Sequence, residues 1–328
     1  QVKSFFMKIS VIAPMYNEEA NLQDTFSKIE IDFKKNNIVN YEIIFVNDGS
    51  TDQTWDKAKE LENKHENLKV TGYAVNQGRG KALRTGFNFA TGDIICTIDF
   101  DLSYDISHIT RMIKELEMNA ITDVVLTSCY MPGGKIIGVP RFRLFVSKTA
   151  NFLYRFAFSP KIYTSTCVVR AYRKEAIKYL ELESNDKEIH LEIISKLLSN
   201  GFKIKEIPGT LTRRIESSQA PQRKTFKFRR HSFSHIIYFI QEKPFTLFGL
   251  LGFVLCILSF LSSLILLYSR FSGDIEFNNT IVSRTMSPNL IIILFLSGLQ
   301  MIGLGFLGIQ NNLLKKELFK TQKQINKK

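Results

Sequence analysis

Two aspartates, spaced two residues apart, follow a short apolar run in the segment Ile94–Asp101. A carboxylate pair at the end of a strand can hold one hard divalent cation once the chain bends. Mg²⁺ or Mn²⁺ held in this way keeps coordination positions open for phosphate oxygens. Such a pair also occurs as a solvated turn or a helix cap. Asp99 and Asp101 therefore point to a metal-bound diphosphate if other segments bring polar groups to the same place.

Short β-branched runs alternate with longer helical stretches from residue 9 to about residue 128, which is typical of an α/β fold with a mostly parallel sheet flanked by helices. We expect strands at Ile9–Ala13, Tyr41–Asn47, Leu68–Ala74, Asp93–Ile98 and Asp123–Thr127. Helices are expected between them at Glu18–Lys35, Thr54–Lys64, Gly80–Ala90 and Ile106–Glu117. Ligands of such sheets bind beyond the carboxyl ends of the strands, so the residues leaving each strand are the candidates for a site.

Polar and acidic residues follow each of the first two expected strands. The first strand leads into Pro14-Met15-Tyr16-Asn17-Glu18-Glu19, and the second ends in Asn47-Asp48-Gly49-Ser50-Thr51-Asp52. A helix cap at Asn17 and a turn with positive φ at Gly49 would explain these segments without a ligand. They would not explain why successive strands deliver acidic groups to one edge of the sheet.

A glycine-containing loop, Asn76-Gln77-Gly78-Arg79-Gly80-Lys81, precedes the third expected helix. Its backbone freedom and its two cations suit an approach to diphosphate oxygens. Leu83 occupies the third glycine position of the dinucleotide-binding fingerprint, and no Walker pattern is present. The loop favours a diphosphate ligand without predicting a Rossmann or P-loop site.

The last quarter of the chain is apolar. Phe245–Tyr268 and Pro288–Leu314 contain no charged residue, and each exceeds the about 20 residues that a membrane-spanning helix needs. We therefore expect a domain at 1–222, a basic interfacial helix at 223–243 and membrane helices at 244–268 and 287–314. An external loop at 269–286 would join the two helices, and a basic cytoplasmic tail would follow at 315–328. A helix packed on the domain is the alternative for the basic segment.

The net charge of +13 is concentrated beside the apolar segments. Cations cluster before the first of them and after the second: Arg213, Arg214, Arg223, Lys224, Lys227, Arg229, Arg230, Lys315, Lys316, Lys320, Lys323, Lys327 and Lys328. The positive-inside rule then places the domain and both chain ends in the cytoplasm, with only the hairpin loop outside. No recognised nucleic-acid module is present, so we expect these cations to meet anionic lipid headgroups and not nucleic acid. Four dispersed cysteines predict neither disulfides nor a zinc site.

Taken together and in order, four segments resemble inverting glycosyltransferases of the GT-A fold. Among these the chain is most similar to the polyprenyl-phosphate glycosyltransferases, which include dolichol-phosphate mannose synthase and the bactoprenol glucosyltransferases. The segments are Val11–Glu19, Val46–Asp52, Asn76–Lys81 and Asp99–Leu102. The resemblance covers residues 8–216 and implies a GT-A domain followed by a two-helix transmembrane hairpin.

The resemblance also implies roles for individual residues. The nucleoside would be bordered by Pro14, Tyr16, Glu18 and Asp48, and Arg79 or Lys81 would assist the departing diphosphate. The metal on the sugar nucleotide would be held by Asp99, Asp101 and Ser103, where family members often have Gln in place of the serine. The acceptor phosphate would be held by Arg143 and Ser147 of an Arg-x-x-x-Ser segment and by Arg214, which follows the strand segment Glu206-Ile207-Pro208. Asp101, Arg143 and Arg214 are thus the expected catalytic residues, although a solvent-facing basic helix start is the alternative for Arg143.

Two segments depart from the family pattern. Ser128-Cys129-Tyr130 has a cysteine where a phosphate-binding arginine is common. The stretch Thr164–Arg170 lacks the usual acidic residue and the usual Ser-Gly-Phe. Both changes concern the acceptor and sugar pockets, so the sugar is less well predicted than the fold.

The resemblance implies inverting, metal-dependent transfer of a hexose from a UDP- or GDP-sugar to dolichyl or undecaprenyl phosphate at the cytoplasmic membrane face. A phosphate monoester has a second pKa near about 6, so this nucleophile needs no protein base. Two alternatives remain, namely a membrane glycosyltransferase that extends a lipid-linked or polysaccharide hydroxyl acceptor, and a catalytically weak membrane scaffold subunit. The nucleotide base, the hexose and the lipid stay open, and the sequence allows a homo-oligomer.

Overall fold

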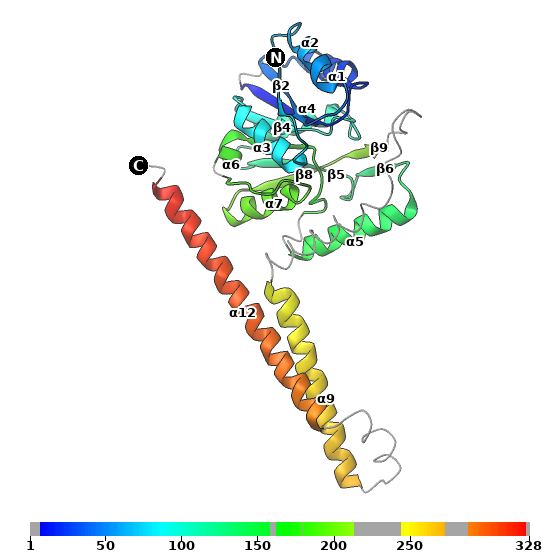
Figure 1. Cartoon of the computed structure of the whole chain (residues 1–328), viewed down its shortest axis with the longest axis vertical. Coiled ribbons are helices and arrows are strands. Elements are labelled where there is room, and N and C mark those ends of the chain that lie inside the picture. The colour runs from blue at the N-terminus through cyan, green and yellow to red at the C-terminus, as the bar shows by residue number, and fades with distance from the viewer. Residues whose placement is uncertain (1–6, 158–161, 179, 213–243, 273–287, 326–328) are drawn as a thin grey trace. The chain divides into compact units, whose positions relative to one another are not determined.

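The computed structural model describes residues 7–157, 162–178, 180–212, 244–272 and 288–325 (Figure 1). The chain divides into two compact units, Gln1–Ser232 and Phe233–Lys328. The first contains the mixed α/β part and the second contains two long apolar helices. Each unit is described by itself.

The amino-terminal unit is built on a seven-stranded sheet with the order β3-β2-β1-β4-β7-β5-β8. Its strands are β1 (Ile9–Met15), β2 (Tyr41–Asp48), β3 (Leu68–Tyr73), β4 (Ile94–Thr97), β5 (Val124–Ser128), β7 (Arg170–Arg173) and β8 (Ile204–Pro208). β7 runs antiparallel to β4 and β5, and the other neighbours are parallel. A separate parallel pair consists of β6 (Lys135–Ile137) and β9 (Thr210–Thr212). The expected mostly parallel sheet is confirmed.

Helices cover both faces of this sheet. The helices of this unit are α1 (Leu22–Lys35), α2 (Thr54–Glu62), α3 (Arg79–Phe89), α4 (Ser107–Met118), α5 (Arg141–Ala157), α6 (Lys174–Lys178) and α7 (Ile189–Ser199), of which all but α5 contribute to the two cores. Buried side chains of α1, α2 and α4 share one core cluster with the sheet, and those of α3, α6 and α7 share the other. The sheet is therefore the middle layer of three.

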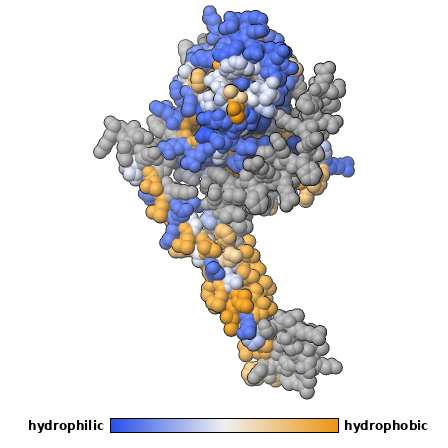
Figure 2. Space-filling model, viewed as in Figure 1, coloured by the Kyte–Doolittle hydropathy of each residue, from blue (hydrophilic) through white to orange (hydrophobic). Residues whose placement is uncertain are grey.

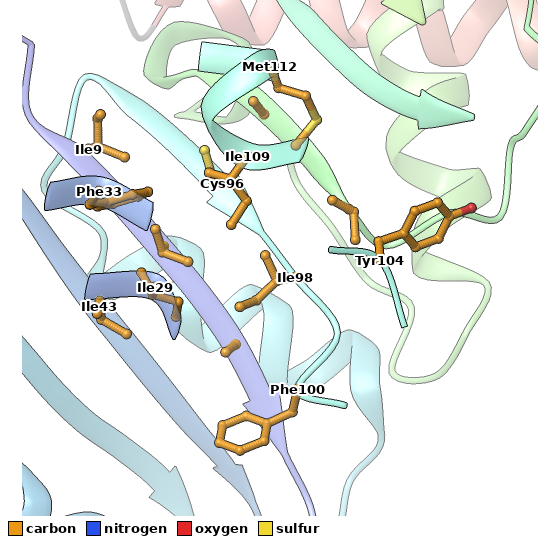
Figure 3. Close-up of a cluster of buried hydrophobic side chains, with 14 of the residues drawn as sticks. Ile9, Ile29, Phe33, Ile43, Cys96, Ile98, Phe100, Tyr104, Ile109 and Met112 are labelled. Carbon is orange, nitrogen blue, oxygen red and sulfur yellow. The ribbon is translucent and has the colours of Figure 1, made fainter. Parts of the chain in front are cut away.

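Alternate residues of the central strands enter opposite cores because successive side chains of a strand point to opposite faces. Val11 belongs to the core under α1 and α4, whereas Ile12 belongs to the core under α3 and α7. Figure 3 shows the first of these cores, where Ile29 and Phe33 of α1 and Met112 of α4 lie over the strands. Burial on both faces explains why these strands are continuous apolar runs.

The first helix begins later than the sequence suggested. We expected it near Glu18, and a cap at Asn17 was the explanation that needs no ligand, but α1 begins at Leu22 and has no side-chain cap. Asn17 instead adopts a φ of 56°, and its N–H donates to Ser50 Oγ at 3.0 Å. Asn17 thus joins the loops that follow β1 and β2, so capping of α1 does not explain this residue.

The carboxy-terminal unit contains α9 (Leu250–Ser272), preceded by a π-helical turn at Phe245–Gly249, and α12 (Pro288–Ile325). Their segments Leu250–Tyr268 and Pro288–Leu314 are long and apolar enough to cross a membrane. Figure 2 shows the hydrophobic surface of these helices. The two expected apolar helices are confirmed. The predicted basic helix at 223–243 lies outside the described residues.

Small residues bring α9 and α12 into close contact. A Cβ atom on Gly252 would lie 2.5 Å from the Gly298 carbonyl oxygen, and one on Gly298 would lie 2.6 Å from Cys256 Sγ. Nearer the hairpin loop, Ser259 Oγ donates to the Ile291 carbonyl at 2.9 Å. Backbones that approach this closely gain van der Waals contact, which supports helix association in lipid.

Candidate functional site

The loop after β4 holds its two aspartates around a buried aromatic anchor. Phe100 is buried and packs edge-on against Phe45, with ring centroids 4.9 Å apart. Its carbonyl accepts a hydrogen bond from Thr25 Oγ1 at 3.0 Å. Since Phe100 points into the core, Asp99 and Asp101 on either side of it remain partly exposed at the carboxyl edge of the sheet.

Ser103 orients the second aspartate. Its N–H and its hydroxyl both donate to Asp101 Oδ1, at 2.9 Å and 2.5 Å. Leu102 between them has a φ of 50°, which turns the chain back towards the carboxylate. Thr212 N–H donates to the Ser103 carbonyl at 2.9 Å. Thr212, which precedes Arg214 by two residues, therefore contacts this loop. Arg214 itself lies outside the described residues.

The first aspartate faces an arginine of α3. Arg79 Nη1 lies 3.1 Å from Asp99 Oδ1, and the Asp99 side chain is 19 % exposed. Burial raises the pKa of Asp99, the positive charge of Arg79 opposes this shift, and the negative charge of Asp101 adds to it. Lys187, on the loop before α7, also acts to lower the pKa of Asp99. Two carboxylates and at least two cations therefore share this edge of the sheet.

The atoms that could bind a metal ion at this edge of the sheet are all oxygens. Asp99 and Asp101 supply carboxylates and Ser103 supplies a hydroxyl, a set that suits Mg²⁺ or Mn²⁺. Among the described residues, no group of three or more His, Cys, Asp or Glu side chains could hold a metal ion. The residues thus fit a divalent cation that completes its coordination with phosphate oxygens and water, and do not form an all-protein cage.

Asp48, expected beside the nucleoside, is buried and holds the loop between β3 and α3. Its Oδ1 accepts from the hydroxyl of Tyr73 at 2.8 Å and from the N–H groups of Gln77 and Gly78 at 2.9 Å and 3.0 Å. Asn76 Nδ2 donates to its other oxygen at 3.1 Å. Burial and the nearby carboxylate raise the pKa of Tyr73, so its hydroxyl stays a donor. In this structure Asp48 acts as the anchor of the loop that presents Arg79.

The residues expected beside the nucleoside lie together after β1. Pro14 lies opposite Val46 of β2, one residue before the end of β1, and both Pro14 and Tyr16 are partly buried. Glu18 N–H donates to Thr54 Oγ1 at 2.8 Å, and Asn21 Nδ2 donates to the Glu18 carboxylate at 2.7 Å. The loop after β1 is thereby fixed to the start of α2, so that both segments border one edge of the sheet.

The amino terminus of α3 is closed by another loop of the protein. Gly80 and Lys81 donate their N–H groups to the Asn185 carbonyl at 2.8 Å and 3.2 Å. A Cβ atom on Gly78, whose φ is 98°, would lie 2.4 Å from that same carbonyl oxygen. The glycines therefore permit this close approach, and the side chains of Arg79 and Lys81 remain as the groups that could reach a diphosphate.

Glu192 supports that loop from α7, and sequence reasoning missed it. Its buried carboxylate accepts from the N–H groups of Glu183 and Ser184 at 2.8 Å and 2.9 Å and pairs with Lys196 at 2.7 Å. Burial raises the pKa of Glu192, but these bonds outweigh that effect and lower the pKa. A buried glutamate within an otherwise apolar helical pattern was the available signal. Glu192 thus supports Asn185 and, through it, the start of α3.

Two of the expected acceptor residues, Arg143 and Ser147, lie on α5. Tyr130, which follows β5, donates its hydroxyl to Ser147 Oγ at 2.7 Å. One turn later the buried Asn151 donates to the Ser147 carbonyl and accepts from Ser165 N–H, both at 3.0 Å. These bonds fix α5 to the segments that follow β5 and precede β7, and they place Ser147 beside the same edge of the sheet.

The outer side of α5 is basic and aromatic. Arg143 is exposed, and no acidic residue occurs in the helix. Phe142, Phe145 and Phe152 are also exposed, each with at least 67 % of its surface accessible. Their spacing of three and seven residues places them along one stripe of the helix. This stripe can meet an apolar phase while Arg143 meets an anion at its boundary.

The two departures from the family pattern have structural explanations. Cys129 is buried in the core, where burial raises the pKa of its thiol, so this position delivers no cation to the site. In the other segment, Glu206 of β8 accepts from the N–H groups of Tyr163 and Thr164 at 2.7 Å and 2.8 Å. The start of the altered stretch is therefore held by hydrogen bonds from its backbone to a partly buried carboxylate.

The chain matches a known protein family. The profile of glycosyl transferase family 2 matches residues 10–180, a little over half of the chain. A curated relative, dolichol-phosphate mannosyltransferase of Pyrococcus furiosus, is 34% identical over 229 residues, or 69% of this chain and 62% of that protein. The chain thus spans less than two thirds of that relative. Polyprenol monophosphomannose synthase of Mycolicibacterium smegmatis is 29% identical over 211 residues, covering 62% of this chain and 77% of the relative.

Solved structures resemble the amino-terminal unit. Glucosyl-3-phosphoglycerate synthase of Mycobacterium tuberculosis, in complex with Mn²⁺, UDP-glucose and phosphoglyceric acid, superposes with a TM-score of 0.52 at 18% identity. The match covers 71% of this chain and 80% of the synthase. At this identity the likeness concerns the fold, and it confirms the expected GT-A arrangement.

Proposed function

The chain belongs to glycosyl transferase family 2, and on this premise we propose that it transfers a hexose from a UDP- or GDP-sugar to a polyprenyl phosphate, with inversion at the anomeric carbon. The two curated relatives are named for mannosyl transfer to dolichol or polyprenol phosphate, which supports the acceptor class. The proposed site comprises the edge of the sheet that carries Asp99, Asp101 and Ser147. It also includes Arg214, which lies beyond the described residues.

One observation supports the proposal more than any other. The segments after β4 and β5 turn opposite kinds of groups to one edge of the sheet, namely a carboxylate pair at Asp99 and Asp101 and a helix bearing Ser147 and Arg143. The carboxylates suit a cation on a diphosphate, and the helix suits an anionic acceptor with an apolar tail. A sugar nucleotide and a lipid phosphate need this combination.

On the donor side, the residues bind and orient a charged leaving group. Asp99, Asp101 and Ser103 would hold a divalent cation that supplies electrostatic stabilisation to the departing diphosphate. Arg79 already points to Asp99 from the loop that Asp48 anchors, and would turn part of its charge towards the diphosphate oxygens. Pro14, Tyr16 and Glu18 would border the nucleoside, next to the loop after β2.

On the acceptor side, the residues position a nucleophile that is already ionised. Lipid phosphate is largely dianionic at neutral pH, because its second pKa lies near about 6. Arg143, Ser147 and Arg214 would hold its oxygens, and their charge and hydrogen bonds would offset the repulsion between two anionic substrates. The attacking oxygen would approach the anomeric carbon from the face opposite the diphosphate, which gives inversion.

One observation favours a second candidate, transfer to a sugar hydroxyl. Such an acceptor needs a base, and Asp186 and Glu188 flank Lys187, whose charge acts on Asp99. A carboxylate in this loop could accept a proton from a hydroxyl acceptor. The lipid-phosphate acceptor is nevertheless the better supported, since both the relatives and the basic aromatic surface of α5 agree with it.

We also propose that the protein is integral to the membrane, with two spans and with the domain and both chain ends in the cytoplasm. The apolar segments of α9 and α12 supply helices of sufficient length. The basic residues of segment 223–243 would lie at the cytoplasmic headgroups. Protease accessibility in sealed vesicles tests this: a tag at either chain end should be cleaved only from the cytoplasmic side.

The reaction is tested with full-length protein in detergent, Mg²⁺ or Mn²⁺, a panel of UDP- and GDP-sugars, and polyprenyl phosphates of several lengths. We expect glycolipid and nucleoside diphosphate from one donor, and loss of both products in Asp101→Ala. Asp56→Ala, which removes an exposed aspartate of α2, is the matched control and should retain activity. Donor binding without glycolipid at any lipid length would contradict the phosphate acceptor. Product with a sugar acceptor, lost in Asp186→Asn or Glu188→Gln, would establish the second candidate.

A further inference from the structure

A primary amide lies at the centre of the second apolar helix. Gln300 is close to the midpoint of the apolar segment Pro288–Leu314 of α12, and its side chain is exposed. Within the part of the chain that the structure describes, no hydrogen bond engages this amide. By contrast, the hydroxyl of Ser259 in α9 donates a hydrogen bond to the Ile291 carbonyl. Within the described hairpin, the Ser259 hydroxyl thus has a hydrogen-bond partner and the larger Gln300 amide has none.

The position of Gln300 on the helix excludes α9 as its partner. Gly298 and Gly305 are buried, and a Cβ atom on either would crowd the first apolar helix or the turn before it. Gln300 follows Gly298 by two residues, which rotates it about 200° around the helix axis. Gln300 therefore lies on the opposite side of α12 from the surface that packs against α9.

That opposite side carries a regular pattern. Exposed residues recur at alternating spacings of three and four along α12: Ile293, Leu296, Gln300, Gly303, Leu307, Gln310 and Leu314. This spacing keeps one seam on the same side of a helix through successive turns and is the pattern of helices that pair along their length. At Gly303 a Cβ atom would have no neighbour within 4 Å, so the backbone is open to close approach one turn from Gln300.

An unpaired amide is unfavourable at this depth. Hydrocarbon offers no hydrogen-bond partner, and an amide transferred into it without one loses several kcal/mol. Gln300 is also too short to reach the headgroups from the middle of a bilayer about 30 Å thick. An apolar stripe alone would be stable against lipid, so Gln300 is the residue that requires a partner.

We propose that the face of α12 defined by Ile293, Leu296, Gln300, Gly303 and Leu307 pairs with the same face of a second copy of this chain. This inference rests on the proposed placement of the hairpin in a membrane. An amide is both donor and acceptor, so two Gln300 side chains related by a twofold axis satisfy each other. An isologous contact also brings the two Gly303 positions together, where the backbones can approach.

Cysteine cross-linking in native membranes tests the face directly. Leu296→Cys lies on the seam, and Phe295→Cys is its matched control at the same depth, with 57% and 47% of the native side chains exposed. Both are made in a Cys256→Ala background, which removes the native thiol of the hairpin. Upon oxidation with copper phenanthroline, which couples two thiols into a disulfide, we expect a covalent dimer from Leu296→Cys only. Equal cross-linking of both variants, or of neither, would overturn the proposal, as would an adduct with a different protein.

Substitution of the amide gives a second, independent measurement. In nanodiscs, single-molecule photobleaching counts should shift from two copies to one in Gln300→Leu, with a roughly tenfold weaker association for about 1.4 kcal/mol lost. Gln300→Asn, which keeps an amide, should restore part of the pairing. Unchanged counts in Gln300→Leu would contradict the proposal. Neither measurement depends on glycosyl transfer, so loss of the proposed reaction and loss of pairing are distinguishable.

Discussion

Arg79 Nη1 lies 3.1 Å from Asp99 Oδ1, so a side-chain cation already occupies the neighbourhood of the carboxylate that we propose as a metal ligand. A metal ion and the guanidinium repel each other, and a diphosphate attracts both. Donor binding should therefore release Arg79 from Asp99 and leave the carboxylate to the metal. The ion pair would then couple metal binding to the presence of the nucleotide.

Arg79→Gln tests this coupling because it should change the affinities for the metal ion and for the nucleotide sugar in opposite directions. We expect Mn²⁺ alone to bind about three- to tenfold more tightly, because a competing positive charge is removed, and the nucleotide sugar to bind about tenfold more weakly, because a cation for the diphosphate is lost. Manganese electron paramagnetic resonance and donor titration calorimetry measure the two separately. Arg79→Lys keeps the charge and serves as the control. Weaker binding of Mn²⁺ alone in Arg79→Gln would refute the competition.

Ser147→Ala should act on the lipid and not on the sugar nucleotide. Loss of one hydrogen bond to the acceptor phosphate predicts a roughly tenfold higher KM for polyprenyl phosphate, with the donor KM unchanged. Tyr130→Phe removes the hydroxyl that orients Ser147 and should give a smaller change of the same kind. Initial rates over a grid of both substrates resolve the two KM values. An equal rise in both would assign Ser147 a structural role.

Glu192→Gln should weaken donor binding without any contact between Glu192 and the donor. The neutral side chain holds the N–H groups of Glu183 and Ser184 less strongly, so Asn185 would be less well fixed on α3. Hydrogen exchange should accelerate at Ser184 and Gly80, and the donor Kd should rise by about fivefold to tenfold. Glu175→Gln on the exposed side of α6 is the control. Faster exchange confined to Ser184 would disprove the connection to α3.

Glu42 should stabilise the domain in a pH-dependent way. Burial raises the pKa of Glu42, but bonds from Lys69, Ser10 and Thr91 outweigh it and lower the pKa from 4.5 to about 2. The folded state therefore binds the proton less well than the unfolded chain. The resulting stability is present above about pH 4.5, is lost as pH falls towards about 2, and amounts to about 3 kcal/mol at neutral pH.

Glu42→Gln should remove this contribution. In guanidinium titrations followed by the fluorescence of the one tryptophan, Trp55, the variant should be about 2–3 kcal/mol less stable at pH 7. The gap to the wild type should narrow as the pH is lowered from about 5 to about 3. Asp24→Asn, which breaks an exposed ion pair with Lys28, should change stability by less than about 1 kcal/mol. A gap that is constant with pH would show that the Glu42 charge is not its source.

The sequence predicted the elements whose side chains follow one simple period. β1, β2, β4 and β5 are apolar because both faces are covered, and Asp99 and Asp101 could be placed at a strand end for that reason. β7 was not predicted. Its four residues include Arg170, which is fully buried and bonded to the Cys167, His190 and Ser165 carbonyls. A buried arginine in a short strand gives no apolar run, so periodicity cannot detect it.

The residues that support the site could not be predicted from the sequence either. Asn185 is more than a hundred residues from Gly80 along the chain, and only the packing of α7 beside α3 shows that its carbonyl meets that helix. Asp48 could be assigned to the edge of the sheet, but its hydrogen bonds to the backbone of Gln77 and Gly78 depend on the conformation of a loop. Contacts that involve backbone groups leave no pattern of residue types or spacing in the sequence, so they cannot be predicted from it.

The insertion of β7 sets an order in which the site can be assembled during synthesis. β1 to β4 pair with one another, so the part of the donor edge that carries Asp99, Asp101 and Ser103 can form once residue 103 has been made, and Asn185 closes the start of α3 later. Among the strands that the structure describes, β5 has only β7 and β8 as neighbours, and both come after it in the chain. Helix α5, which carries Ser147, lies between β5 and β7 in the chain, so it has no fixed place beside the sheet until β7 pairs with β5. A nascent chain could therefore engage a nucleotide well before it could position a lipid.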